Sequence, residues 1–307
     1  MGMLIDGVWQ DDVDRFMVDG AFQRETSSFP SAIGADVIEA LRVTPERFVL
    51  VASFSCPWSH GAVLAWMLKG FSQTVAVQRA GGKRVEGYGL LRGGPLSGPM
   101  DICHMHQLYS ASDAAFTGRA TVPMLWDRAA GRGVSNSSAD IMLAFDGAGD
   151  GDSLYPSALA QDIDGLIVQI FDGLSNAVYR AGLAERQDAY DGAIEQVFGT
   201  LDWLETRLSG QRYLFGDQLT LADVRLFATL VRFDTVYATH FRCTRKRIVD
   251  YPSLWRFARR MYQMVGVKQT VDFEDIIEGY YVNDGSHNPF GLIGAQPVID
   301  WDDTTDL

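Results

Sequence analysis

The sequence predicts a small α/β domain followed by an all-helical domain. A continuously apolar strand at 48–54 runs directly into a helix, and short strand and helix patterns alternate up to about residue 150. Beyond that point the apolar residues recur at helical spacing. A chain of 307 residues with 47% hydrophobic content is long enough for two such domains.

The first unit is a strand, a turn and a helix. The run FVLVASF at 48–54 has the composition of a strand buried on both faces, and it ends at Ser55-Cys56-Pro57-Trp58. Pro57 suits a first helical turn, and Gly70 is placed to terminate the helix. Cys56 therefore lies between a buried strand and a helix start.

The remaining α/β elements are shorter. We expect strands at 74–78 and 121–127, a stub at 133–135 and a helix at about 138–145. Pro123 stands at the start of a predicted strand, where a cis bond or an edge position would accommodate it, and a structural turn is the alternative.

Two apolar patterns predict the helical domain. One includes Ile163, Leu166 and Ile170, and the other Ile194, Val197 and Leu201. Thr220-x-x-Asp223 then opens an apolar segment as a capping box. We predict an extension at 1–47, an α/β domain at 48–150, a helical domain at 151–285 and a tail at 286–307.

Composition excludes several classes. The net charge of −13 and the pI near 4.7 argue against nucleic-acid and anionic-membrane partners. Three scattered cysteines, without a Cys-x-x-Cys pair, are too few for a disulfide framework or a zinc cluster. No export signal or membrane span is evident, so we expect a cytoplasmic protein. Because no zinc-binding cysteine pattern is present, we expect no metal.

Cys56 is the candidate nucleophile. The unpaired N–H groups and the dipole at a helix start favour the thiolate, which is the reactive form. A buried, inert cysteine is the competing interpretation, and placement alone does not decide between them. Position 59 is a serine, so an adduct on Cys56 would have to be cleared by another thiol.

The other two cysteines have simpler interpretations. Cys103 stands beside His104 and His106, but these three residues lack a fourth ligand, so a helix surface is preferred to a metal site. Cys243 lies in the basic stretch HFRCTRKR. A solvated loop or helix end is preferred there to a second activated thiol.

Several motifs together resemble the glutathionyl-hydroquinone reductases, the Xi class of glutathione transferases. They are CPWSH at 56–60, TVPMLWD at 121–127, LTLADVRLFATLVRFDTVYATHFRC at 219–243, DYPSLWRFARRMYQ at 250–263 and TVDFEDIIEGYY at 270–281. The resemblance implies a thioredoxin-like N-terminal domain, a helical C-terminal domain, a homodimer, and glutathione bound beside Cys56.

The resemblance also implies roles for individual residues. Val122 and Pro123 would pair with the cysteinyl part of glutathione, and Ser137 and Ser138, after Asn136, would meet its γ-glutamyl end. Trp58, Tyr88 and Arg119 complete the expected thiol-binding set. A hydroquinone pocket would be lined by three tyrosines, namely Tyr179, Tyr237 and, from the 280–281 pair, Tyr280.

The chain departs from the family pattern in the thiol-binding half. Ser137 replaces a glutamate, Gly61 replaces an arginine, and Tyr88 stands where a tryptophan is usual. These changes suggest a different thiol cosubstrate or weak glutathione affinity. The resemblance as a whole implies glutathione-dependent reductive dethiolation of glutathionyl-hydroquinones, which are small quinone–thiol conjugates, through a Cys56 mixed disulfide. The alternatives are an omega-like thioltransferase or dehydroascorbate reductase, and a non-catalytic binding protein. Use of another low-molecular-weight thiol such as mycothiol is also open. Only four of the 26 basic residues are lysines, an arginine bias that can accompany GC-rich coding, and some bacteria with GC-rich genomes use mycothiol in place of glutathione.

Overall fold

The chain packs into two compact units in the computed structural model, which describes residues 2–11, 13, 16–31, 33–97 and 102–307. The sheet unit comprises Met1–Arg15, Glu25–Asp152 and Thr270–Asn283. The helical unit comprises Phe16–Arg24, Ser153–Gln269 and Asp284–Leu307. The predicted extension at 1–47 is divided between the two units, with residues 16–24 in the helical unit and the rest in the sheet unit. Residues 270–283, predicted in the helical domain, group with the sheet, and the predicted tail belongs to the helical unit.

A five-stranded mixed sheet organises the sheet unit, in the order β7-β6-β5-β8-β9. Its strands are β5 (Phe48–Ala52), β6 (Ala76–Gly81), β7 (Gly89–Leu90), β8 (Met124–Asp127) and β9 (Arg132–Ser135). β5 is parallel to β6 and antiparallel to β8, so it lies at the centre, and all five of its residues are buried. This is the predicted thioredoxin-like arrangement.

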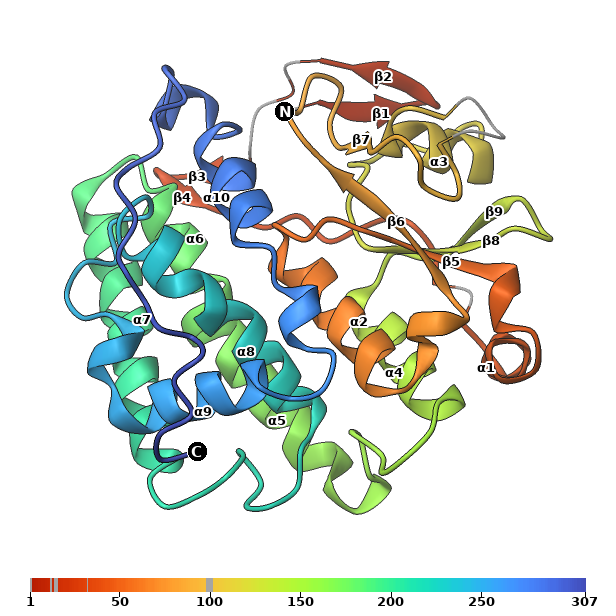
Figure 1. Cartoon of the computed structure of the whole chain (residues 1–307). Helices are drawn as coiled ribbons and strands as arrows, with labels where there is room; N and C mark the ends of the chain where they lie inside the picture. Colours follow the sequence, from red (N-terminus) through yellow and green to blue (C-terminus); the bar gives the residue numbers. More distant parts are fainter. Residues whose placement is uncertain (1, 12, 14–15, 32, 98–101) are drawn as a thin grey trace. The chain divides into compact units, whose positions relative to one another are not determined.

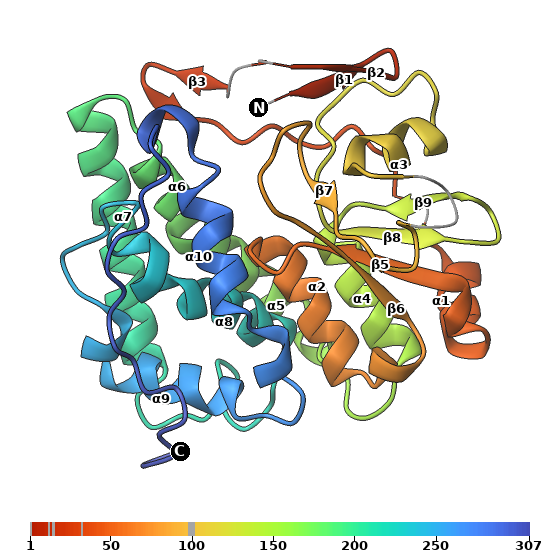
Figure 2. The same cartoon turned by 45° about the horizontal axis from the view of Figure 1, so that its top comes forward.

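Helices cover both faces of this sheet (Figures 1 and 2). α1 (Ala35–Val43), α2 (Pro57–Leu68) and α4 (Ser138–Ala148) lie on one face. α3 (Met105–Ser112) and the hairpin of β1 (Met3–Ile5) and β2 (Val8–Gln10) lie on the other. A buried cluster that includes Leu4, Val51, Met105, Tyr109 and Trp126 fills this second face, and Cys56 and Tyr88 pack against it.

Two predicted elements need correction and one is confirmed. The strand expected at 74–78 is β6, which begins at Ala76 and continues to Gly81. Its second half was missed because Gln78, a polar residue, is buried in the strand, where its side chain bonds to Leu91 O and Leu96 N. The Val122–Pro123 bond is cis, as one of the predicted alternatives required. The N-terminal region, expected to be an extension wrapped over a core, contains secondary structure that was not predicted: β1, β2, α1 and a second hairpin, β3 (Met17–Val18) and β4 (Ala21–Phe22).

The helical unit contains α5 (Ala160–Ile170), α6 (Ala177–Gly182), α7 (Gln187–Arg207), α8 (Leu221–Arg232) and α9 (Pro252–Tyr262). The capping box predicted at Thr220 and Asp223 is present at the start of α8. A short π-helical stretch follows each of two helices, with Phe171–Ser175 after α5 and Phe233–Tyr237 after α8. Such stretches shift the side chains that follow them around the helix axis, and they are frequent at functional sites.

α10 (Phe273–Tyr281) belongs to the sheet unit. Arg79 of β6 bonds to Asp272 at 2.6 Å, and Asp272 caps α10. A Cβ at Gly279 would lie only 2.3 Å from the Ser55 side chain, so a glycine permits this close approach. α10 therefore packs beside the turn that carries Cys56.

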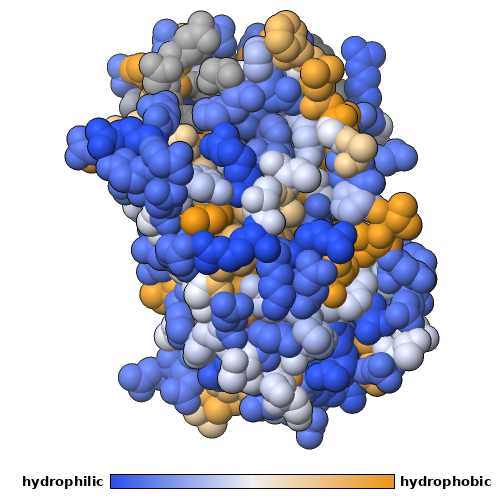
Figure 3. Space-filling model, turned by 90° about the vertical axis from the view of Figure 1, so that its left-hand side faces the viewer, coloured by the Kyte–Doolittle hydropathy of each residue, from blue (hydrophilic) through white to orange (hydrophobic). Residues whose placement is uncertain are grey.

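One face of the molecule is mostly polar. Figure 3 shows one face on which hydrophilic residues predominate and hydrophobic residues form small separate groups. Among the described residues, no helix combines the length and apolar character needed to cross a membrane. The tail from Gly285 is irregular apart from one short turn of 3₁₀ helix.

Candidate active site

Cys56 occupies the N-cap position of α2, as predicted. Its backbone is extended, Pro57 follows at the first helical position, and its carbonyl accepts the His60 backbone N–H at 2.9 Å. The thiol is half-buried and its Sγ lies 4.0 Å from the carbonyl oxygen of Val122. A half-buried thiol at a helix start is accessible to a small-molecule disulfide or thioether.

Val122 is therefore beside the candidate nucleophile, at the loop that enters β8. Thr121, the residue before it, is fixed through Tyr109, whose hydroxyl donates to Thr121 O at 2.9 Å. Asn136 donates to the same hydroxyl at 2.8 Å. Asn136 thus binds the loop from within the unit, so it positions the site rather than presenting its side chain to a ligand.

Ser137 caps α4, and Ser138 is the first residue of that helix. The Ser137 hydroxyl accepts the Asp140 backbone N–H at 3.3 Å, and the Ser137 N–H donates to Ser135 Oγ at 3.0 Å. Both serines are half-buried. They stand at a helix start, which favours a bound carboxylate.

The glycine at position 61, where the family usually has an arginine, is explained by the packing of α2 on α4. A Cβ at this position of α2 would lie 3.2 Å from Met142 Sδ of α4. Gly61 is buried where the two helices meet, so an arginine here would point into that contact.

Arg119 and Tyr88, which also belong to the predicted thiol-binding set, are engaged within the sheet unit. Arg119 Nε donates to Glu25 Oε2 at 2.6 Å, and its Nη1 to Val13 O at 3.5 Å. Tyr88 accepts from Arg84 Nη2 at 2.9 Å, and the Arg84 guanidinium lies 4.1 Å from the centre of its ring. Arg84 and Glu25 were missed in the sequence, where nothing linked either residue to its partner.

A hydrogen bond beneath the nucleophile's helix was also missed. His60 Nε2 lies 3.0 Å from Thr270 Oγ1, and both side chains are buried.

Trp58, in the same helical turn as His60, is half-buried. Ten residues after Thr270, Tyr280 of α10 is half-buried while Tyr281 is buried, so Tyr280 is the more accessible member of the pair.

Tyr179 and Tyr237 meet in the helical unit. Their ring centroids are 6.0 Å apart, and Phe241 packs against both rings. Tyr237 is fully buried, whereas Tyr179 is half-buried. Arg24 lies 5.0 Å from the Tyr179 ring centre and donates to Asn176 Oδ1 at 2.9 Å. The structure thus brings these two predicted tyrosines together and places the Arg24 guanidinium beside the Tyr179 ring.

The remaining cysteines differ from each other in exposure. Cys243 is fully buried, not on the solvated loop that was preferred, and burial raises the pKa of its thiol to about 12. It is therefore not an activated thiol either. Cys103 is exposed, two residues before the start of α3.

Comparison with known proteins identifies relatives of this chain. Residues 187–260 match the model of the glutathione S-transferase C-terminal domain. The chain is 38% identical to glutathionyl-hydroquinone reductase PcpF of Sphingobium chlorophenolicum, over 97% of each chain. It is 40% identical to glutathionyl-hydroquinone reductase YqjG of Escherichia coli, over 99% of this chain and 97% of YqjG.

Two solved structures extend the similarity to three dimensions. The Xi-class transferase from Natrialba magadii superposes with a TM-score of 0.88 at 35% identity, covering 99% of this chain and 96% of its own. The glutathione-bound structure of YqjG gives 0.83 at 38% identity, covering 98% and 97%. With these relatives matched along nearly its whole length, the chain belongs to the glutathionyl-hydroquinone reductase family, the Xi class of glutathione transferases.

Proposed function

We propose that this protein removes glutathione reductively from glutathionyl-hydroquinones through a mixed disulfide on Cys56. The observation that carries the proposal is the half-buried Cys56 thiol at the start of α2, 4.0 Å from the Val122 carbonyl. PcpF and YqjG, which match nearly the whole chain, are both named for this activity.

In the first step the Cys56 thiolate attacks the sulfur of the conjugate. The new bond joins Cys56 Sγ to the glutathione sulfur, and the bond from that sulfur to the ring carbon breaks. The carbon keeps the electron pair and takes a proton. The free hydroquinone leaves, and Cys56 carries glutathione as a mixed disulfide.

In the second step a glutathione thiolate attacks the mixed disulfide at its glutathione sulfur. Glutathione disulfide leaves and the Cys56 thiolate is regenerated. The conjugate and one glutathione thus become hydroquinone and glutathione disulfide. Ser59, three residues after Cys56, offers no thiol, so this step is assigned to an external thiol.

The tyrosines are assigned to the leaving group. Tyr179, Tyr237 and Tyr280 would orient the hydroquinone ring and supply the proton to its carbon, a role that requires a hydroxyl within hydrogen-bond reach. The packing of Tyr179 on Tyr237 and the accessibility of Tyr280 support this assignment.

The glutathione site is assigned to the sheet unit. Val122 and Pro123 would pair with the cysteinyl backbone, and Ser137 and Ser138 at the α4 start would bind the γ-glutamyl carboxylate. Trp58, Tyr88 and Arg119 complete the set. Since Arg119 already pairs with Glu25, a cosubstrate carboxylate would have to share or replace that partner.

We further propose that the protein is a cytoplasmic homodimer. A reducing compartment would keep Cys56 and the cosubstrate as thiols. Light scattering on the purified chain measures its mass in solution, and a monomeric mass would contradict the dimer.

Turnover of a glutathionyl-menadiol conjugate by the wild-type protein tests the function. Hydroquinone release that requires both Cys56 and glutathione supports the reductase. Turnover of dehydroascorbate or a mixed disulfide, with none of the conjugate, would instead identify an omega-like enzyme. No turnover of either, with an unreactive Cys56, would identify a binding protein.

A further inference from the structure

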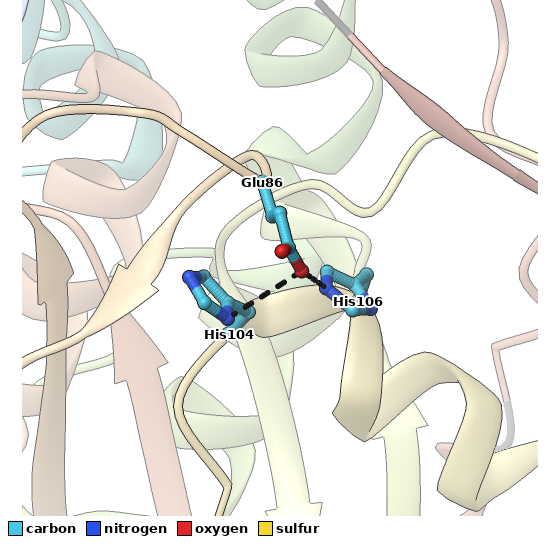
Figure 4. A group of neighbouring side chains, drawn as sticks. All are labelled: Glu86, His104 and His106. Atoms are coloured by element: carbon cyan, nitrogen blue, oxygen red, sulfur yellow. Dashed lines mark hydrogen bonds and ion pairs between the residues drawn. The ribbon is translucent and has the colours of Figure 1, made fainter. Parts of the chain in front are cut away.

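Glu86, His104 and His106 converge in the sheet unit, at a place that the proposed reaction does not use (Figure 4). One ligand atom from each lies within 4.8 Å of the others. Glu86 comes from the segment before β7, His104 caps α3 and His106 is in its first turn. The two histidines stand out in the sequence beside Cys103, whereas Glu86, 18 residues upstream of His104, does not.

We propose that these three side chains form a binding site for a divalent transition metal, with Zn²⁺ as the preferred ion. Two imidazole nitrogens and one carboxylate oxygen are an established ligand set for Zn²⁺ with an open fourth position. Hard cations such as Mg²⁺ prefer oxygen ligands and are not expected to bind here.

The distances suit that ion. Glu86 Oε2 lies 3.0 Å from His106 Nε2 and 3.8 Å from His104 Nδ1. Ligand atoms around a tetrahedral Zn²⁺ with bonds of 2.0–2.1 Å are about 3.3 Å apart. The two distances bracket that value, so modest side-chain rotations would close the site around an ion.

The two rings are arranged in a way that a simple histidine–carboxylate hydrogen bond does not require. Their planes are within 10° of parallel, with centroids 5.5 Å apart, and both rings direct a nitrogen at the same carboxylate oxygen. A cation between the two rings and the carboxylate would take one nitrogen from each ring. Coordination through His104 Nδ1 would replace the contact of this side chain with the Gln107 backbone N–H at the start of α3.

The surroundings hold the ligands while leaving access to solvent. Trp9 stacks on His106 with centroids 4.8 Å apart, and its Nε1 donates to Asp11 Oδ1 at 2.7 Å. The side chains of His106, His104 and Glu86 are 12%, 30% and 45% exposed, so the site opens to solvent on the Glu86 side. A water molecule would complete the coordination there.

Binding would join two segments that already share backbone bonds. Met105 N donates to Tyr88 O at 2.8 Å and Leu90 N donates to Cys103 O at 2.7 Å. A metal on Glu86 and the two histidines would add a second connection between the Tyr88 segment and the start of α3.

Metal titration of the EDTA-treated full chain tests the proposal. Cys56→Ser serves as the background, because it removes the reactive thiol as a competing ligand. Native mass spectrometry is expected to show one Zn²⁺ per chain, and Co²⁺ should give the visible absorption of a four-coordinate site. Mg²⁺ should not bind.

Variants assign the ligands. His106→Gln and Glu86→Gln should each weaken Zn²⁺ binding at least about tenfold, whereas His287→Gln, at an exposed histidine outside the site, should not. Circular dichroism confirms that each variant is folded. Absence of binding to the folded background, or binding unchanged in both ligand variants, would overturn the proposal. Binding that requires Cys103, shown by its loss in Cys103→Ser, would overturn this ligand set.

Discussion

His60 Nε2 and Thr270 Oγ1 lie 3.0 Å apart although 210 residues separate them in the sequence. Both side chains are buried, and each is in a segment that borders the candidate active site. His60 is one helical turn after Cys56, and Thr270 begins the segment that leads into α10. This bond fixes the C-terminal segment to the helix whose start carries the nucleophile.

Thr270→Val should destabilise the protein by about 1–2 kcal/mol, because it removes a buried hydrogen bond while keeping the side-chain shape. Urea denaturation followed by fluorescence measures the change. Thr304→Val, at an exposed threonine of the tail, is the matched control and should leave the unfolding free energy unchanged. An equal effect of the two substitutions would contradict the role assigned to the His60 bond.

Asp223→Ala should destabilise the protein by at least about 2 kcal/mol. The Asp223 carboxylate accepts the backbone N–H groups of Leu214 and Thr220 and the Thr220 hydroxyl, and all of these groups are buried. Loss of a cap alone costs about 0.5–2 kcal/mol, and buried donors left without an acceptor add to that cost. Asp217→Ala, at an exposed aspartate in the preceding loop, is the control.

Burial raises the pKa of Asp223 to about 6, against hydrogen bonds from Leu214 and Thr220 that lower it. A carboxyl whose pKa is higher when folded favours the folded state most below its unfolded pKa of about 4, and that contribution is lost as the pH rises through 6. The span corresponds to about 3 kcal/mol. The stability difference between the wild type and Asp223→Asn should therefore shift toward the wild type as the pH falls from 7 to 4. A pH-independent difference would contradict the raised pKa.

Ser137→Glu should tighten glutathione binding, because it restores a charge expected to pair with the ligand's α-ammonium group. A charged hydrogen bond of about 1.5–3 kcal/mol corresponds to roughly ten- to a hundredfold in the dissociation constant. The same change removes the Ser137 cap of α4, so stability should fall by about 1 kcal/mol. Calorimetry measures both effects.

The control for that prediction is Ser137→Gln, which removes the same cap without adding a charge. It should lose the same stability and gain little affinity. Equal affinity of the Glu and Gln variants would show that position 137 does not meet the ammonium group.

Tyr179→Phe and Tyr237→Phe should slow hydroquinone release while leaving the reaction of Cys56 with glutathione disulfide intact. The second reaction needs the thiol alone, whereas the first needs a proton donor for the leaving carbon. Tyr190→Phe, in α7, is the control. Parallel loss of both reactions in the tyrosine variants would indicate a structural rather than a chemical role.

The sequence was sufficient for elements that local patterns determine. The buried strand before Cys56, the helix after it and the Thr220–Asp223 capping box are all present where they were expected. Each rests on an apolar period or on capping chemistry within a few residues. Two Asp-Gly pairs, Asp6-Gly7 and Asp19-Gly20, carried a hairpin signal that was not used, and all four residues have positive φ.

Long-range relationships were out of reach. Nothing in the residues near Thr270 indicates that it bonds to His60, or that α10 joins the sheet unit through Arg79. Likewise Glu86 has no local feature that links it to His104 and His106. Such pairings depend on tertiary packing, so they appear only in three dimensions.

The most direct test of the central claim is the intact mass of the protein after incubation with glutathione disulfide, followed by turnover of the glutathionyl-menadiol conjugate. The account predicts one glutathione adduct on the wild type, none on Cys56→Ser, and conjugate turnover that the same substitution abolishes. An unmodified wild-type protein, or turnover that persists in Cys56→Ser, would contradict a mechanism through a Cys56 mixed disulfide.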